Sequence, residues 1–191
     1  IVSDGTTSDD PILTSAINSY FMDEWFPGDL SLCFCFVFCY LVPFLKTTMC
    51  SITEIYGDLF VHCPPHVPLA HCVSVDLHMS KGIAKIFKSR YGNVPFLKNQ
   101  IQSVGQCATL NYQGRYLFYL ATKRRFFHKP TYSSLAQSLR SLRSNMETLG
   151  LFQLGIPKIS TGLDALEWLR VKEIIRDVFT GSHIEIYVFY L

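Results

Sequence analysis

The sequence lacks the short motifs that identify several common classes of enzyme and binding protein. It contains no GxGxxG or GxxxxGK[ST] loop, so nothing indicates a dinucleotide site or a P-loop. It also has no CxxC pair, no HExxH helix and no GxSxG turn, which are the usual patterns of zinc sites, zinc proteases and serine hydrolases. What remains is a chain of 191 residues without internal repeats, long enough for one α/β domain with a substantial core.

The seven cysteines follow no regular spacing. Three lie in one apolar run, and Cys50, Cys63, Cys72 and Cys107 are scattered singly. An odd number without a repeated spacing argues against a disulfide framework and favours reduced, intracellular thiols. We therefore expect a cytoplasmic or nuclear protein, or one present in both compartments.

Histidines and cysteines are crowded into residues 62–78, as zinc ligands often are. The ligand spacing of a zinc site is missing, however, and a pair of prolines at residues 64 and 65 indicates a loop. We expect incidental core and surface positions, and no metal site. The residues concerned are His62, Cys63, His66, His71, Cys72 and His78.

Charged residues are scarce, at 17% of the chain, and their signs are unevenly distributed. Residues 1–48 hold six acids and one base, a formal charge of −5, whereas residues 49–191 hold 16 bases and nine acids, a formal charge of +7. This excess of positive charge suits an anionic ligand such as a phosphate ester or a nucleic acid. A lysine-rich solvated surface has the same composition, so charge alone leaves both interpretations open.

No apolar run reaches the length that a membrane-spanning helix requires. The most apolar stretch, residues 30–45, is shorter than the ~20 residues of such a helix and is interrupted by Pro43. Its upstream flank is acidic, unlike the basic flank of a signal peptide. We expect no stable membrane association, and we place residues 1–48 outside the conserved fold, as a disordered extension or a gene-model artefact. The folded domain is expected at residues 49–191.

Strands alternate with helices along the rest of the chain. Short runs rich in β-branched and aromatic residues indicate the strands, and apolar residues at helical spacing indicate the helices. Such an alternation predicts a three-layer α/β/α domain with a mixed central sheet covered on both faces. The expected strands are residues 51–56, 69–74, 107–111, 115–122, 152–157 and 183–191. The expected helices contain Ile83, Ile86 and Phe87, then Leu135, Leu139, Leu142, Met146 and Leu149, and finally Val171, Ile174, Ile175 and Val178.

Ligands of open α/β sheets bind in the loops that follow the strands, so these junctions are the candidate sites. Asp58 follows the first strand, where it either caps a turn or accepts a hydrogen bond from the amine of a base; taken alone, the turn is favoured. Gly82 opens the helix after the second strand, where free backbone amides favour phosphate. A plain helix start explains Gly82 equally well.

Two further junctions carry ionisable groups. Lys123 directly follows an apolar strand, and burial lowers the pKa of a lysine and frees its amine as a nucleophile toward a sugar aldehyde. A basic surface cluster at residues 123–129 is the commoner fate of such a run, and a phosphate contact with nucleic acid is a second alternative. Asp164 follows a loop of small residues as either a helix N-cap or a general acid/base, and taken alone the N-cap is favoured.

Together these junctions resemble the macrodomain family. The blocks GDLF, LAHCVS, MSKGIA, RYLFYLATKRR, HKPTY and IPKISTGLD occur in the family's order, followed by a terminal aromatic strand. Within that family the chain is similar to the terminal ADP-ribose protein glycohydrolases, which are also O-acyl-ADP-ribose deacylases. The resemblance covers residues 52–191.

The resemblance implies an ADP-ribose-binding hydrolase that needs no cofactor. Its substrates would be mono-ADP-ribosylated proteins and O-acyl-ADP-ribose, in purine nucleoside metabolism and the DNA damage response, and it would act as a monomer. It implies that Lys123 is the nucleophile on the distal ribose, that Asp164 helps to resolve the adduct, that Asp58 holds the adenine amine and that Phe189 packs on adenine. The other implied ligand-binding residues are Leu59, His71, Ser74, Gly82, Ile83, Thr122, Ser160, Thr161, Gly162 and Leu163.

Two departures from the family pattern bear on turnover. Ser160 and Thr161 stand where the family usually has glycine and cysteine, and Ser80 and Lys81 replace a small pair. Bulkier loops of this kind would tighten the pocket of the distal ribose. A module that binds ADP-ribose without turnover is therefore the first alternative, and a nucleic-acid-binding domain is the second.

Overall fold

The computed structural model of the chain describes residues 50–191. The predictions made for residues 1–48, including the apolar run 30–45, lie outside the described residues and stay predictions. Within the described range, no helix is both long enough and apolar enough to cross a membrane.

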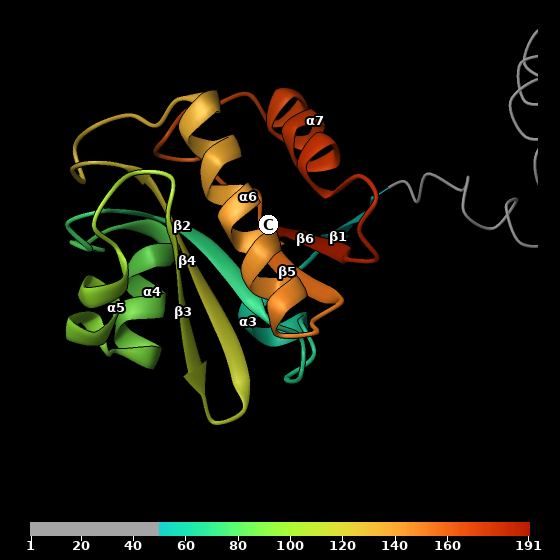
Figure 1. Ribbon diagram of the computed structural model, residues 1–191, viewed down its shortest axis with the longest axis horizontal. Helices are drawn as coiled ribbons and strands as arrows, with labels where there is room; N and C mark the ends of the chain where they lie inside the picture. The colour runs from blue at the N-terminus through green and yellow to red at the C-terminus, as the bar shows by residue number, and fades with distance from the viewer. Residues whose placement is uncertain (1–49) are drawn as a thin grey trace, which may run out of the picture. The chain divides into compact units, whose positions relative to one another are not determined.

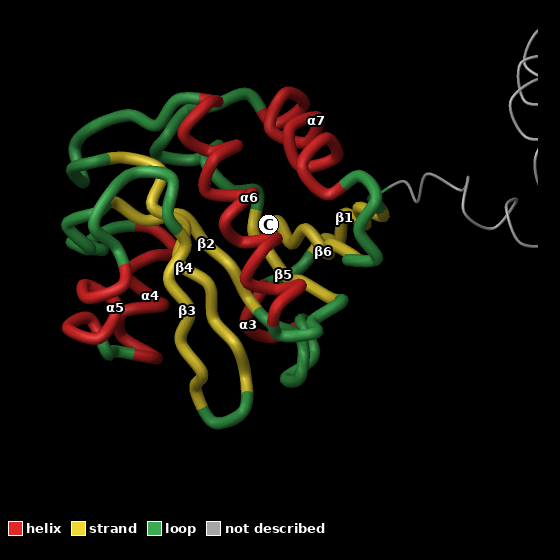
Figure 2. Tube along the Cα trace, in the orientation of Figure 1, coloured by secondary structure: helices red, strands yellow, loops and turns green. Residues whose placement is uncertain are grey.

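A six-stranded sheet forms the centre of the domain (Figures 1 and 2). Its strands are β1 (Ser51–Tyr56), β2 (Leu69–Ser74), β3 (Cys107–Tyr112), β4 (Arg115–Lys123), β5 (Gln153–Pro157) and β6 (Glu185–Tyr190). They lie in the order β1-β6-β5-β2-β4-β3, and every neighbouring pair is parallel except the hairpin β3–β4. The sheet is therefore mixed, as predicted, and its five parallel strands end at one edge.

Helices cover both faces of this sheet and complete the three-layer α/β/α architecture (Figure 1). One face packs against α6 (Tyr132–Thr148) and α7 (Trp168–Phe179). The other packs against α3 (Leu59–His62), α4 (Gly82–Tyr91) and α5 (Val94–Gln100). The short helices α3 and α5 were not predicted from the sequence.

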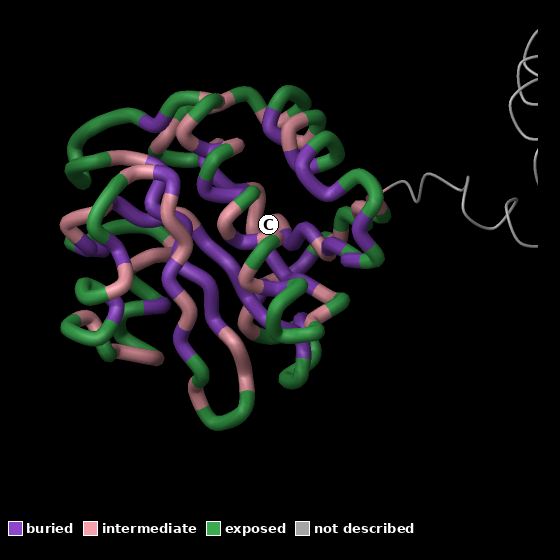
Figure 3. Tube along the Cα trace, in the orientation of Figure 1, coloured by how far each residue is buried: buried purple, intermediate pink, exposed green. Residues whose placement is uncertain are grey.

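The two cores follow from the alternation of side chains along the strands. In β4, Phe118 and Leu120 point into the core beneath α6 and α7, while Leu117, Tyr119 and Ala121 point into the core beneath α4 and α5. All five side chains are fully buried. Figure 3 shows the same burial along the centre of the sheet. A strand buried on both faces explains the continuous apolar run in the sequence.

The predicted long helix is α6, and its ends follow local rules. Thr131 and Ser134 form a capping box at its N-terminus, and Gly150, just past its end, has a left-handed φ of 63°. The prediction that Leu149 belongs to the buried stripe is wrong, since the helix ends at Thr148 and Leu149 is 38% exposed at the C-cap. The rest of the stripe, Leu135, Leu139, Leu142 and Met146, is buried as predicted.

Candidate functional site

The parallel strands bring the predicted junctions to one edge of the sheet. The loops after β2, β4 and β5 leave this edge side by side because these strands are neighbours, and the turn after β1 lies at the same edge beyond β6. In the register of β2 and β4, Ser74 lies opposite Lys123. The sequence-predicted residues at this edge therefore come from four separate segments of the chain.

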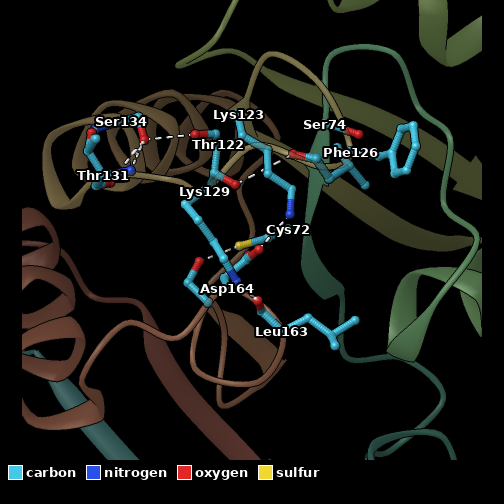
Figure 4. A network of polar contacts seen from close by, with 12 residues as sticks. Cys72, Ser74, Thr122, Lys123, Phe126, Lys129, Thr131, Ser134, Leu163 and Asp164 are labelled. Atoms are coloured by element: carbon cyan, nitrogen blue, oxygen red, sulfur yellow. Dashed lines mark hydrogen bonds and ion pairs between the residues drawn. The ribbon is translucent and has the colours of Figure 1, made fainter.

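Lys123 and Asp164 form an ion pair at the centre of this edge (Figure 4). Lys123 is the last residue of β4, and its Nζ lies 2.5 Å from Oδ1 of Asp164 in the loop after β5. The two side chains are only 15% and 12% exposed. The N-cap interpretation of Asp164 is wrong, because α7 begins at Trp168 and Glu167 is its N-cap residue. Asp164 lies three positions before that cap, and its carboxylate pairs with the lysine instead.

The loop that carries Asp164 has a strained backbone fixed by hydrogen bonds. Ser160 and Ala165, on either side of Asp164, both have a left-handed φ of 59°, which costs a residue with a Cβ roughly 1–2 kcal/mol. The carbonyl of Ser160 accepts a hydrogen bond of 2.9 Å from the backbone N–H of Leu166, which closes the loop. Thr161 donates its hydroxyl to the carbonyl of Lys158 at 2.8 Å.

A contact between Ser160 and Cys72 attaches this loop to the sheet. The Ser160 side chain is buried, and its Oγ lies 3.3 Å from Sγ of Cys72 on β2. Burial raises the pKa of the Cys72 thiol to about 12, even though the hydrogen bond with Ser160 lowers it. Cys72 is therefore a neutral thiol at physiological pH and acts here as a hydrogen-bonding anchor.

The loop after β5 also contacts the loop after β4 and lies next to the start of α4. Lys129, from the loop after β4, donates its ammonium to the carbonyl of Leu163 (Figure 4). Gly82 begins α4 with a φ of 57°, and a Cβ at this position would lie 3.7 Å from the Leu163 side chain. Leu163 itself is 65% exposed, and Gly162 beside it is exposed as well. The predicted residues Gly82, Gly162 and Leu163 thus lie together around the pair.

Asp76 connects the loops after β2 and β4, and sequence reasoning missed it. Its carboxylate accepts hydrogen bonds from the hydroxyl of Ser74 at 2.5 Å and from the backbone N–H groups of Phe126 at 3.2 Å and His78 at 3.4 Å. Burial raises the pKa of this carboxyl, but the three hydrogen bonds and the charge of Arg125 outweigh it, so the pKa is lowered. An isolated acid in a loop gave no signal of this role.

Asp58 lies at the other end of the edge, beside β1 and β6. Its Oδ1 accepts a hydrogen bond of 2.7 Å from the N–H of Phe60 and caps α3, so the turn-capping interpretation is confirmed. The preceding Gly57 donates its N–H to the carbonyl of Tyr190 at 2.8 Å. The adenine-binding role of Asp58 stays a prediction.

Several predicted ligand-binding side chains are packed in the core beneath the site. His71 is fully buried and stacks on Phe87 with 3.9 Å between the ring centroids. Burial lowers the pKa of His71 to about 3, so the imidazole is neutral. The ligand contacts expected of these buried side chains stay predictions. The other buried members of the set are Leu59, Ser74, Thr122, Ser160 and Phe189, and Ile83 is half-buried against the apolar core.

The crowded histidines and cysteines of the sequence do not assemble into a metal site in the described part of the chain. No three His, Cys, Asp or Glu side chains of residues 50–191 lie together as metal ligands would. The four cysteines in this range, Cys50, Cys63, Cys72 and Cys107, are free thiols.

No protein-family model matches the chain. A curated relative is the ADP-ribose glycohydrolase OARD1 of Homo sapiens, with 44% identity over 140 residues, which are 73% of this chain and 91% of the relative. Among solved structures, the macrodomain of Thermus aquaticus DarG is similar, with a TM-score of 0.64 and 22% identity over 73% of this chain and 98% of that one. A further similar structure is Thermosipho africanus DarTG in complex with ADP-ribose, with a TM-score of 0.63 and 18% identity over 73% of this chain and 41% of that one.

The structural similarity and the sequence similarity point to the same family. The DarG macrodomain shares the α/β architecture across nearly its whole length. OARD1 shares almost half of its aligned residues with this chain, over nine tenths of its own length. By these two similarities, the chain belongs to the macrodomain family, together with OARD1.

Proposed function

We propose that the chain is an ADP-ribose-binding hydrolase that removes mono-ADP-ribose from acidic side chains and deacylates O-acyl-ADP-ribose. The observation that carries this proposal is the ion pair of Lys123 and Asp164, 2.5 Å apart and mostly withdrawn from solvent at the edge where the parallel strands end. Two comparisons support it. The relative OARD1 is named an ADP-ribose glycohydrolase, and a structure with the same fold is a complex with ADP-ribose.

The pair supplies both groups that such a reaction needs. A lysine attacks only after its ammonium gives up a proton, and Asp164 is placed to accept it. When the substrate is an acidic side chain esterified at the anomeric carbon of the distal ribose, Nζ of Lys123 then forms a bond to that carbon, and the bond from that carbon to the ester oxygen breaks. Asp164 passes its proton to this oxygen, so the acceptor leaves as a carboxylic acid.

Water completes the cycle on the same carbon. It replaces the lysine nitrogen, which leaves as the free amine, and ADP-ribose is released. Asp164 takes the proton from the attacking water and returns it to the amine, so the ion pair is restored. Asp164 therefore takes part in every proton transfer, and the positions of the two side chains are set by β4 and the loop after β5.

The surroundings of the pair suit an anionic ligand. The start of α4 presents backbone N–H groups, and Gly82 at that start has no side chain to hold a phosphate away. The formal charge of +7 on residues 49–191 favours the diphosphate by long-range attraction. Binding at this edge would bring the distal ribose toward Lys123.

Turnover of a glutamate-mono-ADP-ribosylated protein by the full chain tests this proposal. Lys123→Ala and Asp164→Ala should each lower the rate of ADP-ribose release on the order of a hundredfold or more. Affinity for free ADP-ribose, measured by calorimetry, should stay within a few fold, so that lost turnover is not lost binding. Undiminished release by Lys123→Ala would overturn the assigned nucleophile. Binding without release by the wild-type chain would identify a module that only recognises ADP-ribose.

A further inference from the structure

The loop after β4 presents an unusual run of exposed side chains directly beside the reacting lysine. Residues 124–129, with the sequence RRFFHK, follow Lys123 and are all exposed. Each of the six is cationic, aromatic or histidine, and none is acidic. We name these six residues the rim loop.

Apolar surface lies on both loops that carry the ion pair. In the rim loop, Phe126 is 49% exposed and Phe127 is 67% exposed. In the loop that carries Asp164, Leu163 is 65% exposed, and Figure 4 shows Phe126 and Leu163 with the pair. Large apolar side chains that gather in solvent mark interaction surfaces. The two loops that carry the ion pair thus expose three large apolar side chains.

The rim loop is held in place rather than left free. The N–H of Phe126 donates to Asp76 at 3.2 Å, and its ring stacks on His78 with 4.3 Å between centroids. At the other end, Lys129 donates to the carbonyl of Leu163. A surface fixed before binding loses little entropy when a partner docks on it.

We propose that the rim loop binds the polypeptide around the modified side chain and favours segments with further acidic residues. The proposal rests on the proposed function, since ADP-ribose then occupies the edge of the sheet and the departing acyl group lies outside Lys123. Arg124 and Arg125 meet that side with exposed positive charge, which complements acidic neighbours of the modified residue. The nearby acid, Asp76, is already engaged by three hydrogen bonds.

The geometry of the rings favours a polypeptide over a nucleic-acid strand. Single-stranded nucleic acids stack successive bases on open aromatic faces. Here the planes of Phe126 and Phe127 are at 90°, and those of Phe127 and His128 are at 86°. One face of Phe126 is also covered by His78. Perpendicular rings do not form a row of parallel faces on which successive bases could stack.

Steady-state kinetics of the full chain on three substrates test the rim loop. The substrates are O-acetyl-ADP-ribose, which has no polypeptide, and two peptides mono-ADP-ribosylated on one glutamate, with either acidic or neutral flanking residues. Phe127→Ser and Arg124→Gln should each raise KM for the acidic peptide roughly tenfold and leave its kcat unchanged. The kinetics on O-acetyl-ADP-ribose should not change. Matched controls are Phe96→Ser, on exposed Phe96 of α5, and Arg140→Gln, on exposed Arg140 of α6.

Each other result decides against the proposal in its own way. If the rim-loop variants lose as much kcat/KM on O-acetyl-ADP-ribose as on the peptides, the rim loop binds ADP-ribose and not the polypeptide. If the rim-loop variants turn over all three substrates as the wild type does, the proposed role of the rim loop is wrong and the proposed function stands. No turnover of any substrate by the wild-type chain would overturn both. Competition by a single-stranded oligonucleotide against the peptide, but not against O-acetyl-ADP-ribose, would assign the surface to nucleic acid.

Discussion

Nζ of Lys123 lies 2.5 Å from Oδ1 of Asp164, although the two residues are 41 positions apart in the chain. Both charges are largely withdrawn from water, so each depends on the other for compensation. The same contact places a proton acceptor against the amine. Stability and reactivity are therefore linked at this pair, and the two can be measured separately.

Removing one member of the pair should destabilise the fold more than removing both. Lys123→Met and Asp164→Leu should each lower the free energy of unfolding by about 2 kcal/mol, because each leaves a mostly buried charge without a partner. The double variant should recover part of this loss, and urea unfolding of all four proteins gives the coupling energy. Glu147→Gln, at the exposed pair of Arg143 and Glu147, is the control and should cost less than about 1 kcal/mol. Additive losses would show that the two charges are solvated independently.

The contact between Ser160 and Cys72 should control kcat by positioning Asp164. Ser160→Ala and Cys72→Ala each remove one side of the 3.3 Å contact, and each should lower kcat roughly tenfold, since small displacements of a reacting group are costly. Affinity for ADP-ribose should stay nearly constant. Cys72→Ser keeps a hydrogen-bonding group and should retain most of the wild-type kcat.

A buried serine outside the site separates this effect from general destabilisation. Ser182 is 6% exposed, close to the 7% of Ser160, and it donates its hydroxyl to Phe179 at the end of α7. Ser182→Ala should leave kcat unchanged. An unchanged kcat in Ser160→Ala as well, or a change confined to KM, would show that the contact does not position Asp164.

Gly82 and Gly92 lie at opposite ends of α4 and allow a matched comparison. Both have a positive φ, of 57° and 59°, so alanine at either position should strain the backbone and lower the free energy of unfolding. Only at Gly82 would the new methyl group face Leu163, at 3.7 Å, whereas nothing lies within 4 Å at Gly92. Gly82→Ala should therefore raise the Kd for ADP-ribose roughly tenfold, while Gly92→Ala leaves it unchanged. Equal Kd values in the two variants would remove the start of α4 from the binding site.

The fold was predictable wherever the information was local. Strand periodicity and the apolar stripe of α6 fixed the layers, and the rule that ligands bind beyond parallel strand ends placed Lys123 and Asp164 at one edge. The N-cap of α7 was not predictable, because Asp164 and Glu167 are both acids in the same loop. In the structure Asp164 pairs with Lys123 of β4, and Glu167 occupies the N-cap position without a side-chain cap hydrogen bond.

The role of Asp76 could not be predicted from the sequence for a related reason. Its partner, the N–H of Phe126, belongs to the backbone of a residue 50 positions away, and no side-chain pattern encodes such a contact. The burial of His71 was in principle readable. His71 lies between Leu69 and Val73 at the two-residue spacing of one strand face, and all three side chains point into the core beneath α4.

Asp76 should stabilise the domain at neutral pH but not in acid. Its hydrogen bonds lower the pKa of the folded state, so its contribution is present above the unfolded pKa and is lost as pH falls through the folded value. The difference in unfolding free energy between wild type and Asp76→Asn should be constant above about pH 5 and shrink below about pH 4. The same comparison can be made in proteins that also carry Ser74→Ala, which lack one donor to the carboxylate. There the effect of Asp76→Asn on the unfolding free energy at pH 7 should be smaller. A difference that grows in acid would mean that burial of the carboxyl outweighs its hydrogen bonds.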